Sequence, residues 1–154
     1  MRIYCDLFLD CQANDDILRF IALFDKSFKY DPNKIYSGYL NICMERISLI
    51  PIMNTLNSKK ISAFSVPLYY KHGTITEEDA FNIAKDKSMH KNIEPIFHST
   101  FNRHTPLFYY FETIFLGDNT DGFLPSGIRI DKLDGHLWSD FEYDKYMYDF
   151  NMKF

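Results

Sequence analysis

Hydrophobic and polar positions alternate at the start of the chain and then change to a helical period. Residues 1–11 alternate roughly between apolar and polar, which predicts a first β-strand. After Asn14 or Asp15, either of which can cap a helix, apolar residues recur every three or four positions. These apolar residues are Ile17, Phe20, Ile21, Phe24 and Phe28. We expect a helix that ends before the Asp-Pro-Asn sequence at residues 31–33.

The pattern between residues 34 and 56 fits both a strand and a helix. We expect a strand through Met44 and then a short helix that breaks near Pro51, because proline lacks the amide hydrogen that a helix interior uses. Residues 60–70 alternate again and predict a strand. Pro67 should place the end of that strand at an edge of the sheet.

The second half of the chain continues the alternation of helices and strands. Residues 76–87 open with a capping-box sequence and predict a helix, whereas residues 89–106 look irregular. Residues 107–116 are rich in aromatic and β-branched side chains and predict a central strand. Residues 127–133 should pair with it in antiparallel fashion, and residues 139–150 predict a final helix that begins with a second capping box.

This order of elements predicts an α+β fold in which a mostly antiparallel sheet packs with about three helices. The 154 residues suit one domain of ordinary size, and no linker or repeat divides them. We therefore expect residues 1–154 to form a single globular domain.

Aromatic residues make up 18% of the chain and include 15 Phe and 11 Tyr. A core can take up the phenylalanines, but each buried tyrosine hydroxyl needs a hydrogen-bond partner. Some tyrosines should therefore lie at the surface, and tyrosine is frequent at the energetic centres of protein interfaces.

The cysteines and the first residues indicate where the chain resides. Cys5, Cys11 and Cys43 are odd in number and lack C-x-x-C spacing, which disfavours a disulfide framework and a thiolate zinc site. Asp6 and Asp10 interrupt the first apolar run, which does not fit a signal peptide. No segment approaches the ~18 apolar residues of a membrane span. We expect a cytoplasmic protein that binds no membrane.

The net charge of −4 comes from one stretch of the chain. Residues 131–149 hold six acidic and two basic residues, whereas the rest of the chain is balanced. This distribution lacks the basic stripe of a nucleic-acid-binding protein and favours a basic protein as partner. The expected contact residues are Asp131, Asp134, Trp138, Asp140, Asp144 and Tyr148.

Two His-x-Thr sequences, at residues 72–74 and 98–100, resemble the paired motifs of the 2H phosphoesterases. That resemblance implies His72 and His98 as acid and base on a phosphodiester, with Thr74 and Thr100 as phosphate ligands. In that family each motif lies on a strand in one of two lobes. Only 26 residues separate the motifs here, which leaves little room for two lobes.

Metal and cofactor sites have weaker signals. His98 and His104 are six residues apart and His90 and His98 are eight apart, and neither spacing places two ligands on one helical face. Neither a glycine-rich phosphate cradle nor a nucleophile elbow is present. We therefore expect no metal, no cofactor and no enzymatic activity, with a small phosphodiesterase or RNA-processing enzyme as the alternative.

In its size, acidity and abundance of Tyr and Phe, the chain resembles the immunity proteins of bacterial polymorphic-toxin and contact-dependent inhibition systems. The strand-turn-helix sequence of residues 130–143 is similar in style to such chains. The resemblance implies that the chain neutralises a cognate toxin, often a cationic nuclease, through a tight protein–protein complex. A non-catalytic adaptor subunit is a further alternative.

Overall fold

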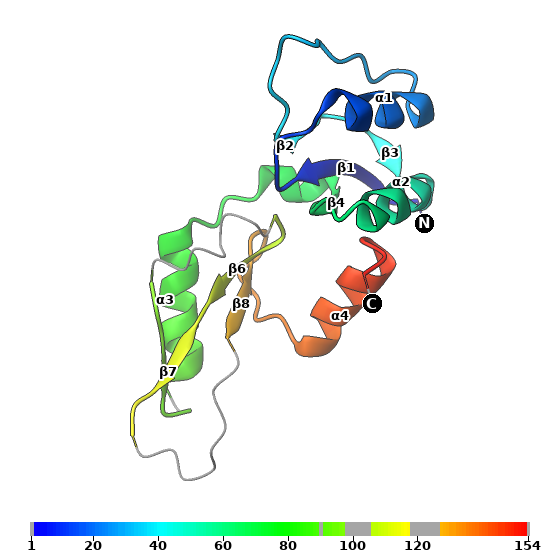
Figure 1. Ribbon diagram of the computed structural model, residues 1–154. Coiled ribbons are helices and arrows are strands. Elements are labelled where there is room, and N and C mark those ends of the chain that lie inside the picture. The colour runs from blue at the N-terminus through cyan, green and yellow to red at the C-terminus, as the bar shows by residue number, and fades with distance from the viewer. Residues whose placement is uncertain (1, 90, 98–105, 118–126, 154) are drawn as a thin grey trace. The chain divides into compact units, whose positions relative to one another are not determined.

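The computed structural model describes residues 2–89, 91–97, 106–117 and 127–153 (Figure 1). The protein has the α+β fold with antiparallel sheets that the sequence predicts. The chain divides into two compact units, one made of Met1–Lys71 with Tyr143–Phe154 and the other of His72–Glu142. Each unit has a buried core of its own. That residues 1–154 form a single domain stays a prediction.

The sheet of the first unit is built around β1 (Tyr4–Leu9), the strand predicted at the start of the chain. β4 (Ala63–Pro67) pairs with β1 along one edge. β2 (Gly38–Tyr39) and β3 (Met44–Glu45) both pair with the other edge of β1. At that edge the Leu7 carbonyl accepts the Leu40 amide, and the Ile3 carbonyl accepts the Arg46 amide. All three pairings are antiparallel. β1 is therefore the central strand of this unit.

A buried carboxylate fills the gap between β2 and β3. The register on β1 shifts by two residues between these strands, where Asn41 adopts a positive φ of 61°. Asp6 accepts hydrogen bonds from the backbone amides of Asn41 (3.2 Å), Ile42 (2.9 Å) and Leu7 (2.7 Å). Its other partner is the Lys71 ammonium, 2.7 Å away. The Asp6 carboxylate thus takes the place of a strand carbonyl as the acceptor for the backbone amides of the bulge.

Helix α1 (Asp15–Phe24) begins as predicted, with the Asn14 side chain accepting a hydrogen bond from a first-turn amide. It ends one turn earlier than the apolar period predicts, so the expected continuation to Phe28 is wrong. Asp25 is extended, and its carboxylate accepts hydrogen bonds from the Ser27 amide (3.0 Å) and hydroxyl (2.6 Å). These local bonds compete with the helix, as aspartate commonly does.

Helix α2 (Arg46–Ser58) continues through Pro51, so the predicted break is wrong. Proline in a helix interior costs roughly 3 kcal/mol. Burying an aliphatic side chain contributes about 1.5–3 kcal/mol, and α2 buries four of them completely. Their combined burial outweighs the proline, which lies on the exposed side of the helix. The four side chains are Leu49, Ile52, Met53 and Leu56.

The C-terminal segment closes the outer edge of β4. Helix α4 (Asp140–Asp149) ends in this unit, where Tyr146 donates its hydroxyl to the Ser65 carbonyl (3.0 Å). The Ser65 amide donates to the side chain of Asn151 (2.7 Å), which is completely buried. Both backbone groups of Ser65 that face away from β1 are therefore satisfied, and this part of the edge cannot pair with another strand.

The described part of the second unit combines helix α3 (Glu77–Ser88) with two strand pairs. The predicted capping box is present, since Thr76 and Asp79 each accept from the backbone amide of the other. The buried side chains of this core are Ala80, Ala84, Phe111, Ile128 and Ile130.

The strand predicted over residues 107–116 is divided at Glu112, and the prediction of one continuous strand is wrong. β6 (Phe108–Phe111) pairs with β8 (Ile128–Asp131) in the antiparallel register that the sequence predicts. β7 (Thr113–Phe115) pairs instead with β5 (Ile93–Pro95), which lies in a segment predicted to be irregular. Because β6 and β7 pair with different strands, Glu112 between them belongs to neither strand.

Within the described ranges, no helix has the length and the apolar character needed to cross a bilayer.

Candidate functional site

The predicted contact residues begin at a tight turn that follows β8. The Gly135 amide donates to the Asp131 carbonyl (3.1 Å), and the Asp131 amide donates to the His136 carbonyl (2.9 Å). Gly135 has a φ of +76°, a conformation that side-chain-bearing residues rarely adopt. A Cβ at this position would also lie 2.9 Å from the side chain of Ile83. This turn brings His136 back beside Asp131.

Asp131 organises the turn from inside the protein. Its carboxylate accepts from the amides of Leu133 (2.7 Å) and Asp134 (3.1 Å) and from the indole nitrogen of Trp138 (2.8 Å). Asp131 is 0% exposed and Trp138 is 6% exposed. The prediction that these two residues form a partner-binding surface is therefore wrong. The reason is that a buried carboxylate and a buried indole each need a hydrogen-bond partner, and these two satisfy each other.

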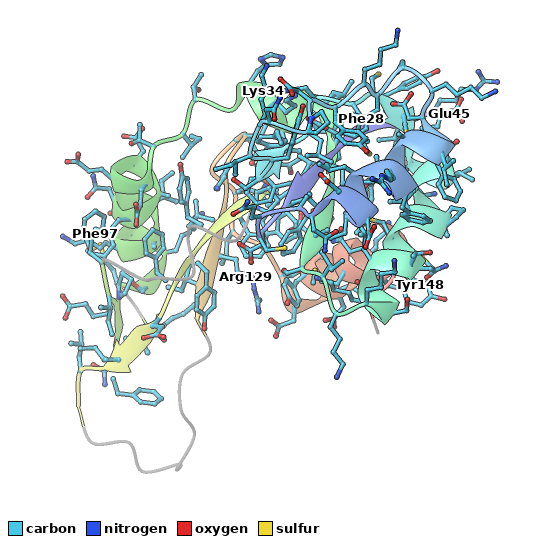
Figure 2. The ribbon with its side chains drawn as sticks, turned by 45° about the horizontal axis from the view of Figure 1, so that its top comes forward. Phe28, Lys34, Glu45, Phe97, Arg129 and Tyr148 are labelled. Atoms are coloured by element: carbon cyan, nitrogen blue, oxygen red, sulfur yellow. The ribbon has the colours of Figure 1, made fainter. Side chains whose placement is uncertain are left out.

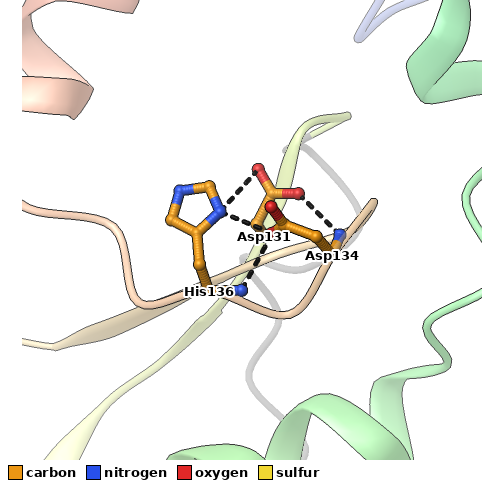
Figure 3. Close-up of side chains that lie close together, drawn as sticks. All are labelled: Asp131, Asp134 and His136. Atoms are coloured by element: carbon orange, nitrogen blue, oxygen red, sulfur yellow. Dashed lines mark hydrogen bonds and ion pairs between the residues drawn. The ribbon is translucent and has the colours of Figure 1, made fainter.

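Carboxylates surround the imidazole of His136, and Figure 3 shows those of Asp131 and Asp134 on the same side of the ring, next to Nδ1. Its Nδ1 contacts the Asp134 carboxylate, and its Nε2 lies 2.7 Å from Glu142 Oε2. Ser139 accepts from the Glu142 amide (3.0 Å), which is one of the two hydrogen bonds that the predicted second capping box requires. The Glu142 side chain turns to His136, and so joins the start of α4 to the turn.

The carboxylates shift the pKa of His136 upward. Partial burial disfavours the charged imidazole, but the hydrogen bonds to Asp134 and Glu142 and the charge of Asp131 outweigh it and raise the pKa. The pKa of Asp134 is lowered, chiefly because its carboxylate accepts the His136 backbone amide. Between these two pKa values both side chains are charged.

We expect the stability of this turn to fall as the pH rises from about 6 to 8. The pKa of His136 is higher in the folded chain, so its charge stabilises the fold fully below the ordinary value of 6.5. That contribution is lost as the pH rises through the folded-state pKa. Thermal unfolding of the His136→Gln variant should depend less on pH over this range. The His72→Gln variant, altered at an exposed histidine, should keep the pH dependence of the parent; equal curves for parent and His136→Gln would contradict the expectation.

The same turn contains a set of side chains that could hold a metal ion. One ligand atom each from Asp131, Asp134 and His136 lies within 4.8 Å of the others. However, Asp131 already accepts from three N–H donors, and both ring nitrogens of His136 already contact carboxylates. The contacts therefore support a role for these groups in positioning the turn.

Asp134 and Asp140 are exposed, as predicted, but both have partners within the chain. Asp134 contacts His136, and Asp140 Oδ1 lies 3.2 Å from Arg129 Nη1 on β8. Such surface ion pairs contribute about 0–1 kcal/mol. These two acids therefore offer a partner less uncompensated charge than their number suggests.

Asp144 and Tyr148 belong to the first unit and line one pocket of about 380 Å³ on α4. Tyr143, Met147 and Lys153 complete its described lining. Tyr148 is 53% exposed and points outward from the helix (Figure 2). The Lys153 ammonium lies 4.6 Å from the centre of the Phe64 ring, and burial lowers its pKa. This pocket thus brings together two of the six predicted contact residues at the surface.

The first His-x-Thr motif does not lie on a strand. His72 ends a short 3₁₀ helix (Leu68–His72), and Thr74 lies in the irregular segment before α3. Both are exposed. His98 and Thr100 of the second motif lie outside the described residues. The pairing of His72 with His98 that the phosphoesterase resemblance implies therefore stays a prediction.

Sequence reasoning singles out neither His136 nor Lys132. A signal for His136 exists, because the Asp-Gly at residues 134–135 is typical of a tight turn after a strand. Lys132 has no such signal. Its ammonium lies 4.7 Å from the centre of the Tyr109 ring, and burial lowers its pKa to about 8.

Comparison with known proteins adds no further constraint on these sites. Searches against protein-family models, curated proteins and solved structures found no match to this chain.

Proposed function

We propose that this chain is a protein-binding inhibitor, most specifically an immunity protein that neutralises a basic toxin. The observation that carries the proposal is the pocket on α4, where Asp144 and Tyr148 come together. Both were expected as contact residues from the charge and the aromatic content of this segment. An adaptor that binds a basic protein without inhibiting it would use the same surface.

The lining of this pocket suits a side chain that is apolar along its length and charged at its end. Tyr143 and Tyr148 provide aromatic area, and Met147 provides a flexible thioether that adapts to different shapes. Asp144 is exposed and belongs to none of the ion pairs among the described residues, although Lys153 also lines the pocket. An arginine or lysine of a partner could contact the rings with its stem and Asp144 with its head.

The charge of the whole chain supports association with a basic partner. The net charge of −4 attracts a cationic protein at long range and increases the rate of encounter. Exposed tyrosine contributes after contact, because it buries a large area at a small cost in side-chain entropy.

The direct experiment uses the full chain as bait in a lysate of its source cells, followed by binding measurements with the purified partner. We expect Tyr148→Ala to weaken binding by about 10–100-fold, as truncation at an interface centre does. Asp144→Lys should slow association by about tenfold at low salt, and the difference should shrink as salt is added.

Two matched variants act as controls. Tyr69 is 55% exposed and Asp86 is also exposed, so Tyr69→Ala and Asp86→Lys make the same chemical changes elsewhere. Both should bind the partner like the parent. Equal loss in the control and test variants would contradict the assignment to α4.

The inhibitory role has its own test. Expression of the captured partner should stop cell growth, and co-expression of the parent chain should restore it. Co-expression of Tyr148→Ala should protect less. A partner that is harmless to cells would leave the binding surface intact as a proposal but overturn the immunity function.

A further inference from the structure

A second pocket in the first unit has a different character. It has a volume of about 270 Å³ and lies between the loop that follows α1 and the bulge between β2 and β3. Asp25, Phe28 and Tyr36 line it from the loop, and Asn41 and Cys43 line it from the bulge (Figure 2 labels Phe28). The pocket is smaller than most sites for drug-sized ligands, which begin at about 300 Å³, and suits one small group.

Asp25 contributes a carboxylate that is only half satisfied. Its Oδ1 accepts two hydrogen bonds from Ser27. Its Oδ2 is buried, and no donor among the described residues lies within hydrogen-bond distance of it. A buried carboxylate oxygen without a donor leaves the negative charge of Asp25 poorly compensated, so a cation that pairs with this carboxylate is favoured.

The electrostatics around Asp25 favour a positive ligand. Asp25 caps the C-terminus of α1, where the unpaired carbonyls of a helix carry partial negative charge. No basic residue lies in the last turn of α1 to balance it. The rings of Phe28 and Tyr36 meet edge to face, 6.3 Å apart, and aromatic faces attract cations.

Two lysines near this pocket bear on its charge. Lys71 is engaged by Asp6 (2.7 Å) and by the Asn41 side chain (3.0 Å), so its charge is already balanced. Lys29 also lines the pocket, and its ammonium makes no ion pair with a described carboxylate. The Lys29 ammonium can therefore compete with an external cation for the Asp25 carboxylate, and an experiment must distinguish the two.

We propose that this pocket binds a protonated amine or guanidinium group, which pairs with the Asp25 carboxylate and packs against Phe28 and Tyr36. The inference goes beyond the proposed function and does not depend on the α4 surface. The group can belong to a small organic cation or to a lysine or arginine side chain of a protein, since both present the same chemistry.

Cys43 provides the readout, because it lines the pocket and is exposed. Bound cation should slow its alkylation by iodoacetamide, as followed by mass spectrometry. Cys11 is also exposed but does not belong to the described lining, so it serves as the internal control. Agmatine and 1-butylamine are the charged probes, and 1-butanol is the neutral one.

We expect agmatine or butylamine to protect Cys43 several-fold and in a saturable manner, with no effect of butanol and no protection of Cys11. Asp25→Asn should weaken the protection by at least about tenfold, as loss of a charged hydrogen-bond partner does. Asp16→Asn removes an exposed acid from the same helix and should leave it unchanged. Protection that is equal in both variants would overturn the proposal.

Two further arms identify the source of the cation and the role of Lys29. Blocked tripeptides with a central arginine or lysine should protect Cys43 as well as the free probes do if the ligand is a protein side chain, and poorly if it is a small cation.

Lys29→Ala should strengthen protection, because it removes a like charge. If no probe protects Cys43 in either the parent or Lys29→Ala, the pocket binds no such group and the proposal is wrong.

Discussion

Replacement of Asp6 by alanine is expected to destabilise the chain by about 3–5 kcal/mol, the range seen when one partner of a buried ion pair is removed. Asp6 is 0% exposed and has four hydrogen-bonding partners, three of them backbone amides. Alanine leaves those amides without an acceptor and Lys71 without its counter-charge.

Urea unfolding followed by circular dichroism measures this loss. Asp16→Ala, which removes an exposed acid of α1, should change stability by less than about 1 kcal/mol. Lys71→Met should cost less than Asp6→Ala, because Asp6 keeps its three amide donors. A cost for Lys71→Met equal to that of Asp6→Ala would show that the ion pair, and not the backbone bonds, dominates.

Asn151→Ala is expected to destabilise the chain by about 2–4 kcal/mol, as truncation of a buried, hydrogen-bonded side chain does. Asn151 Oδ1 is the acceptor for the Ser65 amide (2.7 Å), which has no other acceptor on the β4 edge among the described residues. The Asn57 side chain also fixes this segment through the carbonyls of Asn151 (2.7 Å) and Met152 (3.2 Å). The variant both exposes part of the β4 edge and loosens the end of the chain.

Hydrogen exchange at the Ser65 amide distinguishes this mechanism from general destabilisation. Its exchange should accelerate in Asn151→Ala more than that of central β1 amides. Asn54→Ala, at an exposed position of α2, should be neutral or slightly stabilising, since alanine is the better helix former. Tyr146→Phe should cost less than Asn151→Ala, about 1–2 kcal/mol, because it keeps the buried ring and removes only the hydroxyl that donates to the Ser65 carbonyl. Unchanged stability of Asn151→Ala would contradict the assigned role.

The sequence predicted the exposure of some residues of the candidate site correctly and of others wrongly. The charge of residues 131–149 is a property of the sequence, and the exposure of Asp134, Asp140 and Asp144 agrees with it. Asp131 and Trp138 have the same residue types as a contact surface but are buried together. The sequence shows how many carboxylates and aromatic rings a segment has. Whether a carboxylate is buried depends on which N–H groups the folded chain places around it.

Features that depend on neighbouring residues were determined by the sequence itself. The caps at Asn14, Thr76 and Ser139 are such features, because a side-chain oxygen reaches an amide only three residues away. The antiparallel pairing of β6 with β8 also follows from the pattern of residues, as does the α+β class. Local hydrogen bonds and side-chain periodicity suffice for each of these.

Tertiary structure alone decided the features that depend on distant partners. α2 continues past Pro51 because its other face is buried, and the strand predicted over residues 107–116 divides because β5 and β8 are separate partners. The acceptor for the Ser65 amide comes from a residue 86 positions away, and Asp6 meets its lysine 65 positions away. The free energy of burying a polar group depends on whether such a partner arrives, and no local pattern encodes that arrival.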